Sequence, residues 1–246
     1  MENALLIGLS RQTALLRQMD IIANNLANTQ TAGYKGEKPL FEEYLSKNAR
    51  ITNVPGFSGK VSMVQDRGLL RSFAEGSMVP TENPFDVAIN GKGWLVVDTP
   101  EGERYTRNGH LARNDEGILV NSSGYPVLST AGNINIAADE INITISADGT
   151  VSTSAGDKGK LRIVVFDNEN QLKKQGESLF KSDEPAKPVE NVRILQGVIE
   201  HSNVQPVVEL TEMIKVMRSY IATSKMNEKI DELKRRGIEQ LGPSQV

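Results

Sequence analysis

Near its N-terminus the chain contains the stretch Ile22-Ala23-Asn24-Asn25-Leu26-Ala27-Asn28-Thr29-Gln30-Thr31-Ala32-Gly33-Tyr34-Lys35. It begins with a pattern typical of the last turns of an amphipathic helix. It continues with residues that end a helix. Asn28, Thr29 and Thr31 compete for backbone hydrogen bonds, and Gly33 tolerates the left-handed conformation of a helix C-cap. The sequence therefore predicts an N-terminal helix that ends near Asn28.

Three asparagines stand out on a helix that otherwise presents leucine, isoleucine and alanine: Asn24, Asn25 and Asn28. Burying an amide is costly unless its donors and acceptors are paired, and a neighbouring helix or chain could pair them. This pattern favours a contact between subunits. The alternative is a capped surface helix whose asparagines are solvated.

The same stretch resembles the signature of the flagellar axial family of bacteria, which comprises rod, hook and hook-associated proteins. The resemblance rests on residues 22–28, followed by Thr31, Gly33 and Lys35. Because it covers many positions at fixed spacing, it favours assembly over the solvated surface helix.

Composition excludes several classes of function. At 246 residues and 38% hydrophobic content, the chain can bury one substantial core. Its net charge of −3 argues against nucleic acid and anionic membranes as partners. The absence of cysteine excludes disulfides and is compatible with export to an oxidising space. The N-terminus lacks the features of a Sec signal and no apolar run reaches membrane-spanning length, so we expect no membrane insertion and, if the chain is exported, another route.

Both ends of the chain carry apolar residues at alternating spacings of three and four, interrupted at Gln12 in the first row. Pro206 suits the first turn of the last helix. We predict that the two rows pack against each other, so that the helices pair as an antiparallel, coiled-coil-like hairpin, and that these rows, with the asparagines, form the assembly interface. Its predicted members are Leu5, Leu9, Leu16, Met19, Ala23, Asn24, Asn25, Leu26, Asn28, Leu210, Ile214, Met217 and Ile221.

Between the helices the sequence predicts an antiparallel β domain, so the fold class is mainly β with α. Residues 87–97 read as a hairpin around Gly91-Lys92-Gly93, and residues 141–145 alternate with period two. Residues 161–166 read as a buried strand, and Trp94 as a core residue. We expect residues 1–35 and 205–246 to supply the helices, 36–80 a connecting arm with a β extension, 81–190 the β domain and 191–204 a return strand.

Two further stretches resemble the same family. Residues 197–204, followed by Glu209 and Arg218, look like its C-terminal block, and residues 83–94 with 105–109 look like the β domain of rod and hook proteins. The resemblance implies a structural subunit of the basal-body rod, in the periplasmic space, that contacts itself and other rod proteins, transmits torque and lines the export channel. The short arm between Leu45 and Asp66 favours the proximal rod over the distal rod.

The resemblance also implies the flagellar type III export apparatus as a partner. Early substrates of that apparatus are thought to carry a phenylalanine followed four residues later by an apolar residue, and Phe41 and Leu45 are similar. The alternative is that these two residues form one face of a short helix.

An enzyme reading has little support in the sequence, and we expect no cofactor or metal. His110 and His201 are not at metal-ligand spacing, and Gly91-Lys92-Gly93 lacks the third glycine of a dinucleotide loop. Two readings compete with the structural subunit: a β-domain binding module with helical anchors, and a hydrolase that uses the carboxylate pairs at residues 115–116 and 139–140.

Overall fold

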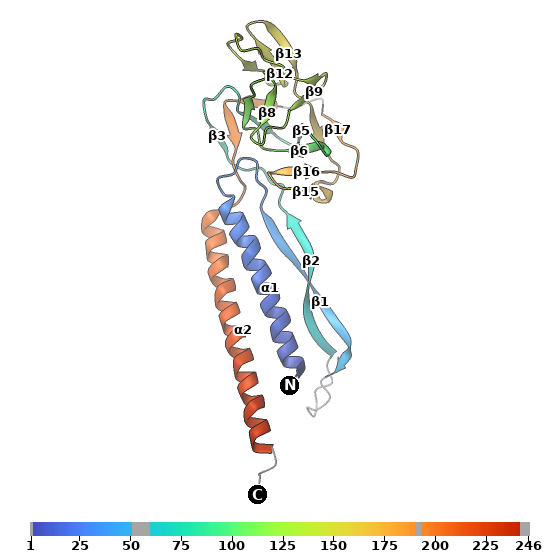
Figure 1. Ribbon diagram of the computed structural model, residues 1–246, viewed down its shortest axis with the longest axis vertical. Coiled ribbons are helices and arrows are strands. Elements are labelled where there is room, and N and C mark those ends of the chain that lie inside the picture. Colours follow the sequence, from blue (N-terminus) through green and yellow to red (C-terminus); the bar gives the residue numbers. More distant parts are fainter. Residues whose placement is uncertain (1, 51–59, 190–192, 242–246) are drawn as a thin grey trace. The chain divides into compact units, whose positions relative to one another are not determined.

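A computed structural model describes residues 2–50, 60–189 and 193–241 of the chain. The chain divides into two compact units, and many of their elements are labelled in Figure 1. Unit one comprises Met1–Ala27, Glu37–Leu70 and Gln205–Val246, and unit two comprises Asn28–Gly36 and Arg71–Val204. Each unit is therefore built from segments that lie far apart in the sequence.

Unit one contains two long helices, α1 (Glu2–Ala27) and α2 (Pro206–Leu241), which lie side by side and run in opposite directions (Figure 1). The residue after α1 is Asn28, whose backbone and side-chain oxygens accept hydrogen bonds from Thr31 at 3.2 and 3.1 Å. At the start of α2, the amides of Val208 and Glu209 donate to the carbonyl of Gln205, each at 3.1 Å. The two predicted terminal helices and their predicted end and start are confirmed.

Unit one also contains β1 (Glu37–Arg50) and β2 (Lys60–Arg71), which pair with each other in a two-stranded sheet. The segment expected to be a connecting arm is thus largely a long β ribbon.

Unit two is built mainly of short strands. Its largest sheet has six strands in the order β15-β16-β6-β5-β14-β17, and neighbouring strands in it are antiparallel. The strands of this unit are β3 (Met78–Pro80), β4 (Val87–Asn90), β5 (Trp94–Thr99), β6 (Gly102–Thr106), β7 (Leu111–Arg113), β8 (Leu119–Asn121), β9 (Leu128–Ser129), β10 (Gly132–Asn133), β11 (Thr144–Ile145), β12 (Thr150–Thr153), β13 (Gly156–Lys160), β14 (Ile163–Val165), β15 (Lys173–Lys174), β16 (Leu179–Lys181), β17 (Lys187–Pro188), β18 (Arg193–Gln196) and β19 (Val198–Glu200).

The central strand β5 separates two hydrophobic clusters. Side chains alternate across a strand, so Leu95 and Val97 join an aliphatic cluster while Trp94 and Val96 join an aromatic one. The Trp94 ring is fully buried, 5.0 Å from the ring of Phe180 between centroids, and its Nε1 donates to Glu169 at 3.1 Å. The predicted core role of Trp94 is confirmed.

Two strand predictions are wrong. Residues 87–97 do not form a hairpin, because β4 pairs with β18 while β5 pairs with β6 and β14. Alternation and the turn at Gly91 indicate that two strands are present but do not determine their ladder partners, which for both strands lie elsewhere in the chain. The alternating segment 141–145 is a strand only at Thr144–Ile145, and Ile141 is 64% exposed.

Truncation in the aromatic cluster should destabilise unit two. We expect Phe180→Ala to lower the free energy of unfolding by about 3–5 kcal/mol, because it leaves a cavity beside Trp94. Ile141→Ala removes an exposed side chain and should change it by less than about 0.5 kcal/mol. Urea unfolding followed by Trp94 fluorescence measures both; equal effects would contradict the assignment of the core.

Candidate functional site

The predicted interface residues are largely exposed in the single chain. On α1, Leu9 and Leu16 are 54% and 44% exposed. The corresponding values on α2 are 45% for Leu210, 52% for Ile214, 50% for Met217 and 46% for Ile221. Ala23 is also exposed, and Leu5, Met19 and Leu26 are half-buried. The prediction that these two rows pack against each other within one chain is therefore wrong for the exposed residues.

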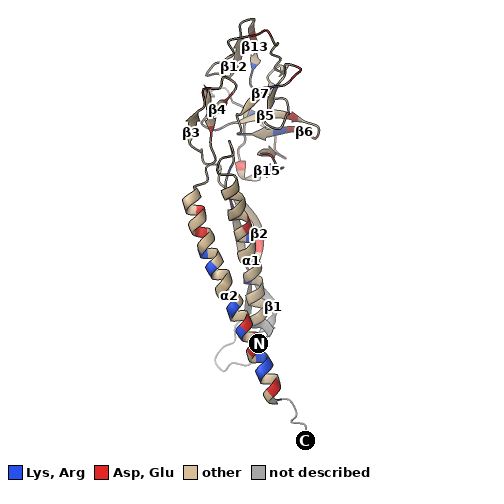
Figure 2. Cartoon of the chain, turned by 60° about the vertical axis from the view of Figure 1, so that its left-hand side comes forward, with Lys and Arg blue, Asp and Glu red and all other residues tan. Residues whose placement is uncertain are grey.

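A neighbouring row on each helix is buried instead. On α1 it contains Gly8, Gln12, Leu15 and Ile22, and on α2 it contains Val216, Thr223, Asn227 and Ile230, all buried or half-buried. Both rows keep the spacing of three and four. Sequence reasoning did not assign these rows to the helix pair, because it followed the more regular apolar residues and treated Gln12 as an interruption. The rows combine apolar residues such as Ile22 with small or polar ones such as Gly8 and Asn227. Several large apolar residues outside these rows are exposed, among them Leu9, Leu16 and Met217. Charges of both signs recur along α2 (Figure 2).

The asparagines of the N-terminal stretch have different environments. Asn25 is 2% exposed; its Nδ2 donates to the carbonyl of Glu37 at 2.8 Å, and its Oδ1 accepts from the amide of Glu37 at 3.0 Å. The predicted contact of Asn25 with another subunit is therefore wrong, because both ends of its amide are used inside the chain. Asn28 takes part in the turn with Thr31, and Asn24 is exposed.

Phe41 lies on β1, so the alternative of a short helix is wrong. It lines a groove of about 270 Å³ together with Ile21, Ile22 and Val208. The side chain of Leu45 lies outside the described residues. Phe41 therefore lies close to other apolar residues of unit one, whether or not it also serves in export.

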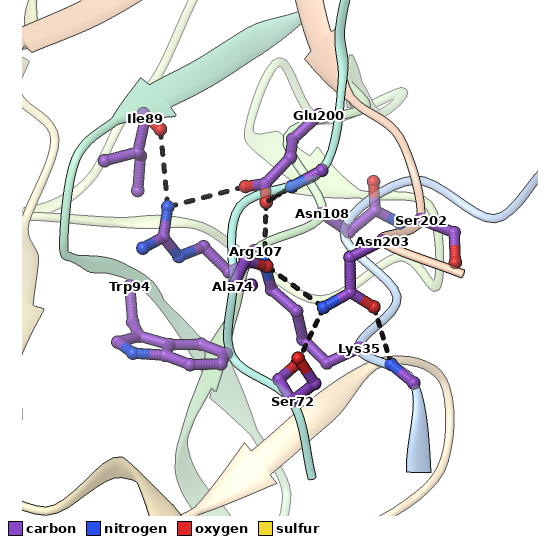
Figure 3. Close-up of polar contacts among 12 residues, drawn as sticks. Lys35, Ser72, Ala74, Ile89, Trp94, Arg107, Asn108, Glu200, Ser202 and Asn203 are labelled. Atoms are coloured by element: carbon purple, nitrogen blue, oxygen red, sulfur yellow. Dashed lines mark hydrogen bonds and ion pairs between the residues drawn. The ribbon is translucent and has the colours of Figure 1, made fainter. Parts of the chain in front are cut away.

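Residues from all three family-like stretches meet around one buried carboxylate in unit two (Figure 3). Lys35 Nζ lies 2.6 Å from Oε1 of Glu200, and both side chains are 1% exposed. Arg107 Nη1 lies 3.4 Å from Oε2 of the same carboxylate. The amide of Gly76 also donates to Oε1, at 2.9 Å. We call Lys35, Arg107 and Glu200 the charge cluster.

Backbone contacts reinforce the charge cluster. The amide of Gly33 donates to the carbonyl of Glu200 at 2.7 Å, and the amide of Gly36 donates to Oδ1 of Asn203 at 2.8 Å. Gly33 has a φ of +66°, and a Cβ there would lie 2.4 Å from the backbone of Arg107. Gly33 is thus left-handed as expected, but its function is close packing rather than capping α1, which ends six residues earlier.

The buried environment of Lys35 disfavours the charged form of its side chain. Burial lowers the pKa of Lys35 from its ordinary value, and the nearby Glu200 carboxylate only partly offsets this effect. Arg107 gains further support from the carbonyls of Ile89 and Gly91, at 3.3 and 2.8 Å, and its guanidinium lies 5.6 Å from the centroid of the Trp94 ring. Two cations therefore depend on one carboxylate in a dry environment.

Removing that carboxylate should be far more damaging than removing a surface partner. Glu200→Gln leaves two buried cations without their anion, and we expect it to cost about 3–5 kcal/mol of unfolding free energy. Asp167→Asn breaks the exposed pair with Lys187 and should cost less than about 1 kcal/mol. Denaturant unfolding read by Trp94 fluorescence tests this, and similar losses for the two variants would refute it.

Chemistry outside the charge cluster is limited. His110 is more than half exposed, with its Nδ1 2.7 Å from Asp86. Among the described residues, no group of three or more His, Cys, Asp or Glu side chains could hold a metal ion. Within the same residues, neither helix has a stretch long and apolar enough to span a membrane.

Three models of known protein families match parts of the chain. Residues 5–35 match the family model "Flagella basal body rod protein", residues 88–153 match "Flagellar hook protein FlgE/F/G D1 domain" and residues 195–241 match "Flagellar basal body rod FlgEFG protein C-terminal". Each model contains one member of the charge cluster.

Curated relatives match over nearly the whole chain. The flagellar basal-body rod protein FlgF of Caulobacter vibrioides is 40% identical over 245 residues, covering 98% of this chain and 99% of that protein. FlgF of Mesorhizobium japonicum is 34% identical, with the same coverage. The flagellar basal-body rod protein FlgG of Agrobacterium fabrum is 33% identical, over 94% of this chain and 96% of its own length. The chain therefore belongs to the flagellar basal-body rod protein family, whose members are structural subunits of the basal body rather than enzymes.

Proposed function

We propose that this chain is a subunit of the proximal rod and polymerises through the outer faces of α1 and α2. The observation that carries the proposal is the exposure of large apolar residues in rows on both helices. Contiguous apolar surface on a single chain marks a site of interaction, because covering it removes apolar area from water. The exposed apolar residues recur at spacings of three, four or seven, which places those of each helix on one face: Leu9 and Leu16 on α1, and Leu210, Ile214, Met217 and Ile221 on α2.

The spacing of these rows fits coiled-coil-like packing against helices of neighbouring subunits. A contact of this kind joins unlike surfaces, so it propagates as a helical assembly unless a partner closes it. We propose that the neighbours include copies of this chain and other rod proteins, that the assembly lies in the periplasm after export, and that α1 and α2 line the export channel and transmit torque. Asn24, exposed at the end of α1, belongs to the proposed contact surface.

Relatives named FlgF and FlgG both support a rod subunit, and the first two relatives above are FlgF proteins. We therefore favour the proximal rod and keep the distal rod as the alternative, because a FlgG relative matches over 94% of the chain. Expression of the chain in strains that lack FlgF or FlgG distinguishes the proximal from the distal rod. If swimming is rescued in the strain that lacks FlgG but not in the strain that lacks FlgF, the proximal assignment is overturned.

A charge placed on an outer row should block assembly without unfolding the chain. We expect Leu16→Asp and Met217→Asp to abolish rod assembly and swimming, because a carboxylate would be buried at the contact without a partner. Leu16→Met and Met217→Leu keep each row apolar and should swim normally. Circular dichroism checks that all four variants fold; swimming by the aspartate variants would show that the outer rows are not the interface.

We also propose that Phe41 contributes to recognition by the type III export apparatus. Val208 provides a matched control, since it lines the same groove but lies outside the Phe41–Leu45 pattern. Phe41→Ala should reduce secretion into the medium, whereas Val208→Ala should leave it unchanged. Secretion is measured by immunoblotting of culture supernatants. Normal secretion of the Phe41 variant would assign this residue to packing alone.

A further inference from the structure

The inner row of the helix pair contains one polar layer. Nδ2 of Asn227 on α2 donates to Oε1 of Gln12 on α1 at 3.1 Å, and this contact joins residues 215 positions apart in the sequence. Gln12 is also the residue that interrupts the apolar row of α1. The buried Thr223 of the same row bonds within its own helix, to the carbonyl of Ser219 at 2.9 Å, whereas the bond between Asn227 and Gln12 joins the two helices.

Gly8 makes room for this layer. It is buried, and a Cβ at its position would lie 1.9 Å from Oδ1 of Asn227, so any side chain there would overlap the amide. Glycine is among the poorest helix formers, and its presence inside α1 weakens the helix. The Asn227 amide occupies the space that the missing side chain leaves.

This polar layer is expected to stabilise the helix pair less than apolar side chains would. Oδ1 of Asn227 is buried and has no hydrogen-bond partner among the described residues. An unpaired buried acceptor loses its hydration without compensation. A glycine, a buried amide and an unpaired oxygen at one place are costs that apolar side chains would avoid, which indicates that the layer contributes specificity.

The specificity it can provide is the register of the two helices. Sliding α2 by one heptad would bring Tyr220 or Lys234 opposite Gly8 in place of the smaller Asn227, whose Oδ1 already lies 1.9 Å from the position of a Cβ on Gly8. In one of these slipped registers Asn227 would face Leu15, which offers no side-chain acceptor. Apolar rows tolerate such sliding, whereas a polar layer permits one alignment.

We propose that Gly8, Gln12 and Asn227 are positioning residues that set the register of the α1–α2 pair and thereby align the outer rows that neighbouring subunits contact. The register itself stands on the contacts above, and the consequence for the outer rows rests on the proposed function. We call these three residues the register layer.

Disulfide trapping in the full-length chain reads the register, since the chain has no cysteine of its own. Ile22 and Met213 stand two heptads from Gly8 and Asn227 along their helices, so Ile22→Cys with Met213→Cys reports the native register. Ile22→Cys with Tyr220→Cys reports a slip of one heptad. In an otherwise unchanged chain, we expect the native pair to cross-link at least about tenfold faster than the slipped pair.

Moving the register layer should move the register. The exchange Gly8→Leu, Gln12→Met, Leu15→Gly and Met19→Gln conserves composition and places the layer one heptad further along α1. We expect the cross-linking preference to invert, with the slipped pair at least about tenfold faster. If these residues merely stabilise the helices, the exchange should lower the helix content and leave the ratio of the two cross-linking rates unchanged.

A second variant covers the case in which the exchanged helix fails to fold. Gln12→Leu with Asn227→Leu removes the layer, and we expect helix content by circular dichroism to be kept while the two pairs cross-link at similar rates. Exclusive native cross-linking in either folded variant would overturn the proposal.

A swimming assay distinguishes failure of the proposed link between register and assembly from failure of the proposed function itself. A slipped chain should fail to assemble, so inverted cross-linking with normal swimming would overturn the link to the outer rows. Failure of the proposed function itself would show in Leu16→Asp, which leaves the register layer intact.

Discussion

The arrangement of unit two depends on the buried carboxylate of Glu200. An ion is stable in a protein interior only when its partners are present together, and this carboxylate has Lys35, Arg107 and the amide of Gly76. Those partners come from the segment after α1, from the β structure and from the loop before β3, while Glu200 ends β19. No subset of these segments satisfies all the charges, so the cluster couples them into one cooperative structure.

Unit one differs from unit two in where its large apolar side chains lie. Its helices use small and polar residues where they meet, as at Gly8 and Asn227, and keep several of their largest apolar side chains on the outside. A monomeric domain would gain by reversing this arrangement. A subunit of a polymer does not, because side chains buried within the chain cannot contribute to contacts with neighbours. The exposed leucines and methionine of the helices are therefore consistent with a chain that completes its packing on assembly.

Local signals in the sequence were sufficient for the parts of the fold that local physics determines. Asn28 and Pro206 marked the helix boundaries, and the turn-rich middle indicated β structure. Strand partners were not predictable, because alternation around Gly91 shows that a strand exists but not which strand it pairs with. The contact of Lys35 with Glu200 spans 165 positions and left one clue, that both lie in stretches resembling the same family. Asn25 was assigned to the wrong surface because an amide that needs partners does not reveal whether they lie in the same chain.

The residues that carry the family resemblance serve mainly the fold. Asn25, Gly33, Lys35, Arg107 and Glu200 are all buried, and each makes a hydrogen bond, an ion pair or a close backbone contact with another part of the chain. Relatives named FlgF and FlgG both match over most of the chain, as expected if proteins of this family share a fold that buried contacts stabilise. Discrimination between neighbours must then depend on exposed positions, since only these meet another subunit. The exposed positions of this chain include the outer rows of α1 and α2, so these rows, rather than the buried motifs, are available for such discrimination under the proposed function.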